Sequence, residues 1–490
     1  MPAIPRACAL ALLLGCLVAG LAGCSLGGGS SKSGGAAATP PPKESKGTVT
    51  IRFAVGTRGP WQDEFVRQLA RASGGRMKAQ LVAYDASATD VDQRLARDLA
   101  RGRIDVADIA ARAWESRGVA GPSAFQSPFL LTSDALLDRV AADARVTKPI
   151  LESLSTADVT GLAVMPIGVR YLFVAERPLD SPEAFVGARI RVQESATTDA
   201  ILRSLGARPT TAIPNGPDVV AALESGRLDA VEADMPAAVT NGYVRAAPHI
   251  SSPLFAKVTT LVANSNLLRK LGPQAAGWLR VGAERTAAAQ LAVDDRTPWA
   301  SACGAGLKPD PSTPAELDAL HTALLPVHST LDGDLTAQLA IDRMGLHAVR
   351  ERAADPWMRC GRTTAGATRA SVLDGAYEHT VTEEDEARAG SEPGNAGDYR
   401  VEIGSGRYAI LHISPPDPAW PSWDFSRDPV EVGSVLLRGD VATLRPETSI
   451  SAGSEPKIYS FELFRGRLRW RYVRGIEDFL MTAGVWRKVG

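Results

Sequence analysis

Two hydrophobic periods alternate along residues 48 to 355. Short apolar runs rich in β-branched residues predict strands, as in TVTIRFAV, MKAQLVAY and IDVADIAA. Between these runs, WQDEFVRQLARASGG and VDQRLARDLARGR repeat apolar residues every three or four positions, which predicts amphipathic helices. Strands that alternate with helices in this way favour a parallel sheet with helices on both faces.

The same pattern returns later in the chain. GLAVMPIGVRYLFVAE predicts strands that cross between two halves, and ARIRVQES begins a second strand and helix series that ends at the strand LDAVEAD. The sequence therefore predicts an α/β fold with two doubly wound lobes. Open α/β sheets bind ligands at the carboxyl ends of their strands, so we expect a cleft there. Residues 264 to 300 and 313 to 352 are expected to be long helices that pack across both lobes.

From about residue 364 to residue 490 the helices give way to strand, turn and strand units. GDYRVEIGSGRYAILHI, EVGSVLLRGDVATLRP and KIYSFELFRGRLRWRYV predict a meander of antiparallel strands, forming a small barrel or half-barrel. Trp486, near the end of the chain, is expected to pack where the barrel closes. This region resembles the lipocalin-like domains of some exported binding proteins. A structural or partner-contacting module and a second ligand pocket both stay open as interpretations.

The first 47 residues predict export. Residues 1 to 23 carry one positive charge and then an apolar run that is short for a membrane span, as in a secretory signal. Their end, LAGC, resembles the lipobox of bacterial lipoproteins, in which the cysteine, here Cys24, is lipidated; an ordinary signal peptide is the alternative. Residues 24 to 47 are rich in Gly, Ser and Pro, which predicts a flexible tether. We therefore expect an extracytoplasmic protein that is lipid-anchored to the cell membrane.

Composition narrows the possible chemistry. The 54 Lys and Arg residues nearly balance the 55 Asp and Glu residues, which argues against a nucleic-acid partner. Only Cys303 and Cys360 follow the tether, and such a pair in an exported protein predicts a disulfide, with two free thiols as the alternative. The six histidines are scattered without ligand spacing, so neither a metal site nor a cofactor is predicted. No nucleophile and base constellation indicates an enzyme.

Six segments carry a family resemblance over residues 49 to 355. They are FQSPFLL, IGVRYLF, GARIRVQES, SLGARPTTAI, VVAALESGRLDAVEAD and YVRAAPHIS. Their order and spacing resemble those of TRAP-type solute-binding proteins, the extracytoplasmic receptors of tripartite ATP-independent transporters. The resemblance implies a two-lobed α/β periplasmic-binding-protein fold, whose lobes close over a small organic acid and deliver it to the membrane subunits of a TRAP permease.

The resemblance also implies which residues bind the ligand. Arg191 matches the family's main carboxylate-binding arginine, and a planar guanidinium suits two carboxylate oxygens. Arg170 matches a second arginine, whereas Arg189 matches a basic but solvated position. For both Arg191 and Arg170 the alternative is a structural ion pair.

Four further residues are candidates for the pocket. Thr57 and Trp61 match loop positions that line the family's pocket, although Trp61 is equally suited to packing at a helix start. Tyr243 suits the core more than the site. Where the family often has an asparagine, this chain has Ala233 followed by Asp234, and an acid there would repel a second carboxylate. The leading hypothesis is thus a receptor for a monocarboxylate, and the alternative is a sensing or interaction lipoprotein that is not coupled to transport.

Overall fold

The computed structural model describes residues 48–293, 297–310, 312–351, 360, 371–389, 395–414, 428–449, 455–475 and 478–489. The predicted signal segment, Cys24 and the tether therefore lie outside the described residues. Residues 48 to 490 form one compact unit. In the described ranges, every helix is too short or too polar to cross a membrane.

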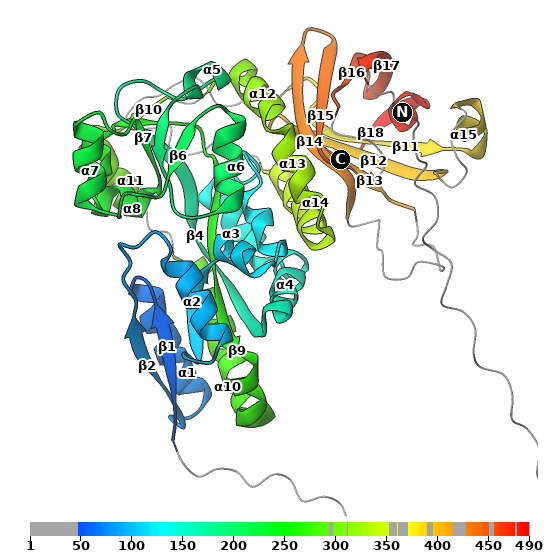
Figure 1. The fold of residues 1–490 in the computed structure, drawn as a ribbon. Helices are drawn as coiled ribbons and strands as arrows, with labels where there is room; N and C mark the ends of the chain where they lie inside the picture. The colour runs from blue at the N-terminus through cyan, green and yellow to red at the C-terminus, as the bar shows by residue number, and fades with distance from the viewer. Residues whose placement is uncertain are drawn as a thin grey trace, which may run out of the picture. The chain divides into compact units, whose positions relative to one another are not determined.

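A ten-stranded mixed sheet forms the first part of this unit (Figure 1). Its main path runs β2-β1-β3-β9-β4-β7-β5-β6, and β8 and β10 pair beside it. The strands are β1 (Val49–Val55), β2 (Met77–Ala83), β3 (Val106–Ala110), β4 (Val159–Val174), β5 (Arg189–Arg191), β6 (Arg208–Thr210), β7 (Ala230–Asp234), β8 (His249–Ile250), β9 (Phe255–Asn264) and β10 (Lys308–Pro309).

The strand directions divide the sheet into two lobes. β1 is parallel to β2 and β3 in the first lobe, and β5 is parallel to β6 and β7 in the second. The long strands β4 and β9 run antiparallel to each other between them, and each also pairs with one lobe. This confirms the predicted two-lobed α/β fold with crossing strands.

Helices cover both faces of the sheet because their apolar stripes need burial. In the first lobe α1 and α10 pack together so closely that Gly282 lies against the backbone of Leu69. The helices and 3₁₀ turns around the whole sheet are α1 (Pro60–Ala72), α2 (Val91–Ala100), η1 (Ala111–Arg117), η2 (Gly121–Gln126), α3 (Asp134–Ala142), α4 (Ala144–Ser153), η3 (Leu154–Ala157), α5 (Pro182–Phe185), α6 (Ala196–Ser204), α7 (Pro217–Glu224), α8 (Met235–Thr240), α9 (Tyr243–Ala246) and α10 (Ser265–Leu291).

The later helical region differs from the expectation. It consists of α11 (Thr297–Gly304), α12 (Pro314–Ala323), α13 (Leu325–Leu331) and α14 (Leu335–Arg350). Instead of spanning both lobes, α14 packs against α4 on one side and the C-terminal strands on the other. Gly345 permits this approach, because a Cβ atom there would lie 2.8 Å from the Val432 side chain. Cys303 of α11 forms a disulfide with Cys360, with their Cα atoms 5.2 Å apart.

The C-terminal strands form a closed eight-stranded antiparallel barrel. They are β11 (Gly375–Val381), β12 (Gly397–Gly404), β13 (Arg407–His412), β14 (Pro429–Arg438), β15 (Val441–Ser449), β16 (Lys457–Phe464), β17 (Arg467–Gly475) and β18 (Val485–Val489), with α15 (Glu383–Ala389) and α16 (Phe479–Thr482) in the connections. Buried aromatic side chains fill the interior, and Trp486 is fully buried among them, as expected. Apart from Cys360, the predicted boundary between residues 355 and 364 lies outside the described residues.

Candidate functional site

Arg191 ends strand β5 and is buried, with 1% of its surface exposed. Its Nε donates a hydrogen bond to the Ile213 carbonyl at 3.0 Å, and its Nη2 has no hydrogen-bond partner in the described residues. Burial, together with the charges of Arg170 and Arg112, lowers the pKa of Arg191. A guanidinium stays charged at neutral pH even so, and a buried donor without a partner is costly. The carboxyl end of β5 therefore holds a positive charge that the described protein groups do not satisfy.

Arg189, two residues earlier, has the opposite environment. It is exposed, and its Nε and Nη2 donate to the Asp229 carboxylate at 2.9 and 2.6 Å. Arg189 begins the three-residue strand and Arg191 ends it, so the two guanidinium groups lie at opposite ends of β5. The solvated position expected for Arg189 is consistent with this exposure.

Arg170 is already paired within the protein. Strand β4 places it opposite Asp234 of β7, and its Nη1 donates to Asp234 Oδ2 at 2.8 Å while its Nε donates to Glu232. Although burial opposes the charge, Glu232 and Asp234 raise the pKa of Arg170. The structural ion pair named as the alternative for Arg170 is thus present in the structure.

Asp234 is more fully neutralised than the sequence indicates. Lys257, on strand β9 at the other side of β4, lies 3.3 Å from Asp234 Oδ2, and Asp234 Oδ1 caps α8 by accepting from the Ala237 N–H at 2.8 Å. Despite burial, Lys257 and Arg170 lower the pKa of Asp234. The acid is therefore held by two cations, which weakens the repulsion expected toward a second carboxylate.

The other three predicted residues lie in different settings. Tyr243 is buried, its hydroxyl accepts from the Gly216 N–H at 3.0 Å, and it lies within electrostatic range of Arg191. Trp61 packs in the core of the first lobe beside Phe65, which is the packing role named above. Thr57 is exposed in the loop after β1. The structure thus brings Tyr243 close to Arg191 and does not group Trp61 or Thr57 with it.

A small cavity of about 20 Å³ lies beside Arg112, Arg170 and Lys257. Such a volume suits one water molecule rather than an organic acid. Arg191 is outside the lining but within electrostatic range of Arg170, Arg112 and Glu232. The lining residues are Ala111, Arg112, Phe125, Gln126, Arg170, Thr198, Glu232, Phe255, Ala256, Lys257 and Val258.

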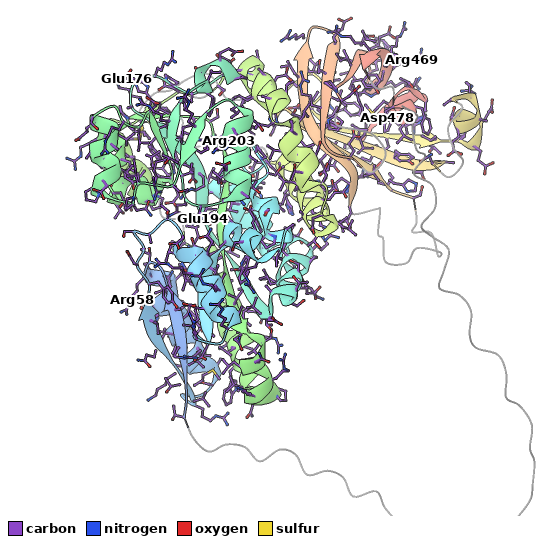
Figure 2. The ribbon with its side chains drawn as sticks, in the orientation of Figure 1. Arg58, Glu176, Glu194, Arg203, Arg469 and Asp478 are labelled. Atoms are coloured by element: carbon purple, nitrogen blue, oxygen red, sulfur yellow. A yellow bond between two sulfur atoms is a disulfide. The ribbon has the colours of Figure 1, made fainter. Side chains whose placement is uncertain are left out.

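Contacts between the lobes explain the small volume. Gln93 of α2 donates to the Glu194 carbonyl at 2.9 Å, and Figure 2 shows Glu194 between the lobes. The Asn215 N–H donates to the Ser87 carbonyl at 3.1 Å. Arg112 bridges the gap by binding both Asp92 and Gln193. The two lobes therefore touch across the cleft, and a ligand larger than water needs them to part.

Sequence reasoning missed Arg112, Lys257 and Glu232. Arg112 follows the carboxyl end of β3, where ligands of open α/β sheets bind, so its position was an available signal. Lys257 is a single cation in the apolar strand FAKVTTLVAN, a pattern that indicates a buried partner. Nearby, burial raises the pKa of Asp108 to about 6, while Gln62 donates to its Oδ2 at 2.9 Å.

The family model for "Bacterial extracellular solute-binding protein, family 7" matches residues 61–329. The chain belongs to this solute-binding family. Two curated proteins resemble the chain over part of their length. The uncharacterized protein YiiZ of Salmonella typhimurium is 24% identical over 42% of this chain and 62% of its own length. The C4-dicarboxylate-binding periplasmic protein DctP of Rhodobacter capsulatus is 30% identical over 24% of this chain and 33% of its own length.

Solved structures place this solute-binding protein in the TRAP-type fold. A TRAP periplasmic solute-binding protein from a Bradyrhizobium species, in complex with D-galacturonate, superimposes with a TM-score of 0.52. The two are 24% identical, and the match covers 60% of this chain and 99% of the other. The family match ends before the barrel, so the barrel is an addition to the part that the family model describes.

Proposed function

We propose that this solute-binding protein is an extracytoplasmic receptor that binds a small organic acid through Arg191 and delivers it to a TRAP-type permease. The observation that carries the proposal is the unpartnered Nη2 of a buried guanidinium at the carboxyl end of β5. Buried donors are nearly always satisfied, so an unsatisfied cation at a ligand-binding position calls for an anion. A carboxylate supplies two oxygens that match the guanidinium.

Charge pairing around the cleft supports a monocarboxylate. Arg170 and Lys257 share the acids Glu232 and Asp234, and Arg112 binds Asp92. Among these described cleft cations, Arg191 alone has no ion-pair partner, so one ligand carboxylate balances the site. The rest of the ligand would then meet neutral donors such as Gln126 and Thr198, which suits hydroxyl groups. The galacturonate of the related structure is an acid of this kind.

Binding would act by closure of the two lobes. A ligand that contacts both lobes stabilises the closed state over the open one by its difference in affinity for the two. Arg112 is suited to this coupling, because it follows β3 in the first lobe and reaches Gln193 in the second. Closure excludes water from the arginine and carboxylate pair, which strengthens it.

Anchoring is part of the same proposal and rests on the sequence LAGC, with Cys24 as the lipidated residue. The barrel favours a second candidate, a surface sensor or interaction protein, because delivery to a permease does not call for a second domain. Intact-mass measurement of the membrane-bound protein would test the lipid on Cys24, and uptake of the identified ligand in a strain that lacks the chain would separate transport from sensing.

The binding site can be tested by calorimetry with D-galacturonate, lactate and succinate as probes. We expect the two monocarboxylates to bind more tightly than succinate. Arg191→Lys should weaken the best ligand about 10- to 100-fold, which corresponds to one charge-assisted hydrogen bond of about 1.5–3 kcal/mol. Arg189→Lys is the matched control, because that exposed arginine should leave the affinity unchanged. Equal affinity in the wild type and Arg191→Lys would contradict the proposal.

A further inference from the structure

A second group of buried polar side chains lies outside the cleft, where α12 and α13 meet the barrel. His321 lies in the last turn of α12, His328 lies in α13, and Glu447 comes from β15; all three are buried. One nitrogen or oxygen atom from each lies within 4.8 Å of the others. The two imidazole rings are nearly parallel, with an interplanar angle of 15° and 6.5 Å between their centres. Three groups that commonly bind metals thus converge from two parts of the chain.

The strand geometry aims Glu447 at the histidines. Val432 of β14 pairs with Thr448 and Gly433 pairs with Pro446, so Glu447 is the extra residue of a β-bulge. A bulge redirects a side chain and frees it from the ordinary alternation of the strand. Glu447 Oε1 lies 3.4 Å from His321 Nδ1, and its other oxygen, Oε2, accepts from Arg407. Arg407 therefore holds the carboxylate in place and leaves one oxygen facing the imidazoles.

The atoms that face this space lack hydrogen-bond partners in the described residues. Both ring nitrogens of His328, His321 Nδ1 and Glu447 Oε1 are buried without one. Each buried polar atom left unsatisfied costs about 1–3 kcal/mol. Such a concentration is unusual in a native interior, where most buried polar atoms are bonded, and it indicates a missing partner.

Further acidic side chains lie beside the same place. Asp332 interacts with Glu447, and Asp342 interacts with Asp332. Asp332 Oδ1 and Asp342 Oδ2 have no partner among the described groups. Arg407 offsets one acid, while the neighbouring Arg343 and Arg445 are bound to acids of their own, Asp428 and Asp318. Asp332 therefore offers a further buried oxygen without a partner beside the three groups.

We propose that His321, His328 and Glu447 bind one divalent transition-metal ion, with Zn²⁺ as the best-suited metal. Two imidazoles and a carboxylate are ligands that zinc favours, and water or Asp332 would complete four-fold coordination. Ligand atoms around a tetrahedral zinc lie about 3.3 Å apart. Side-chain movements on the order of 1 Å would bring the three groups to that spacing.

The metal would join the solute-binding part to the barrel. Its ligands come from α12 and α13 on one side and from β15 on the other, so coordination links elements that are otherwise held by packing and ion pairs. With Asp332 as a fourth protein ligand the buried site has no open position, which is typical of a structural zinc rather than a catalytic one. The ion would therefore fix the barrel against the helices and take no part in binding the organic acid.

The proposal is tested on the purified protein after removal of metal with EDTA. Addition of Co²⁺ should produce the intense visible absorption of a tetrahedral site. Addition of Zn²⁺ should displace the bound Co²⁺ and remove this absorption, at one Zn²⁺ ion per chain. Elemental analysis after gel filtration gives the stoichiometry. His328→Leu keeps the volume of a fully buried side chain and removes a ligand, and we expect it to fold and to weaken metal binding at least ~100-fold, more than the loss of an outer-shell contact.

His249→Leu is the matched control, because His249 lies on strand β8 and is not in the cluster. Its Nδ1 is 2.7 Å from Asp310 Oδ2. It should retain one zinc per chain. A raised melting temperature with Zn²⁺ in the wild type and the control, and none in His328→Leu, supports the site. Absence of retained metal in the wild type, full retention in His328→Leu, or loss in His249→Leu would each overturn it.

Discussion

The barrel interior and the cleft both bury cations, but they satisfy them differently. In the barrel, Lys457 is fully buried, and its Nζ donates to Glu431 at 2.7 and 2.9 Å and to Asp478 at 2.8 Å. Tyr408 adds a hydrogen bond to Glu431 at 2.7 Å. In the cleft, Arg191 keeps a buried N–H group without a partner. A buried cation whose partners all belong to the protein serves stability, whereas a buried cation without an anion beside it is suited to binding a ligand.

The same contrast bears on the role of the barrel. Aromatic residues such as Tyr377, Tyr459 and Trp470 fill its described interior, where the buried Lys457 is paired with two acids. These observations favour the structural or partner-contacting interpretation over a second ligand pocket. The barrel contacts the rest of the chain at α14, because α14 and the barrel strands share one hydrophobic core that includes Met344, Leu411 and Val432.

The largest stability effect is expected from Lys457→Met. This change leaves Glu431 and Asp478 buried without their cation, and breaking a buried ion pair costs about 3–5 kcal/mol. Urea unfolding should show the loss, while the affinity for the organic acid stays the same. Arg469→Met is the control, since Arg469 is exposed on β17 of the same barrel (Figure 2). The double variant Lys457→Met/Glu431→Gln should recover part of the loss; no recovery would mean that the charges are not the cause.

Arg170→Met should come next, with a loss of about 3 kcal/mol in the free energy of unfolding. Glu232 would lose its main partner, whereas Asp234 would still have Lys257, so the cost stays at the lower end of the range for a broken pair. Chemical denaturation of the variant and of Arg170→Lys measures it. Should Arg170→Met unfold like the wild type yet bind no ligand, Arg170 would belong with Arg191 as a binding residue.

The two arginines also show what the sequence could and could not predict. The pattern of strands and helices specifies the two lobes, and the strand GARIRVQES places Arg191 at a carboxyl end, where ligands bind. The pairing of Arg170 depends on the register between β4 and β7, which brings residues 170 and 234 together. A single sequence does not specify register over that distance. For the same reason His321, His328 and Glu447 appear as scattered residues until the barrel closes beside α12.

The buried Asp108 predicts that the stability of the fold depends on pH. Burial raises its pKa from 3.8 to about 6, with Asp92 acting in the same direction and Thr259, Gln62 and Lys257 opposing. The unfolded chain releases this proton near pH 4 and the folded chain near pH 6, so the group destabilises the fold as pH rises between these values, by up to about 3 kcal/mol.

Asp108→Asn should remove this contribution. Relative to the wild type, the variant should gain up to about 3 kcal/mol above pH 6 and nothing below pH 4. Urea unfolding of both proteins at pH 4, 5, 6 and 7 gives the difference, in which the other titrating groups largely cancel. A difference that does not change with pH would mean that Asp108 titrates normally.

Arg191→Met is expected to have the smallest effect on stability and to remove ligand binding. The substitution gives up one hydrogen bond, from Nε to the Ile213 carbonyl, which is worth about 1 kcal/mol. It also removes a buried charge whose Nη2 has no partner, so the two contributions oppose each other and the net change should stay within about 1 kcal/mol. Parallel urea unfolding and calorimetry separate the two readouts. A loss as large as that of Lys457→Met would show that Arg191 is held by the fold itself, and the contrast between cleft and barrel would then fail, because both cations would serve stability alone.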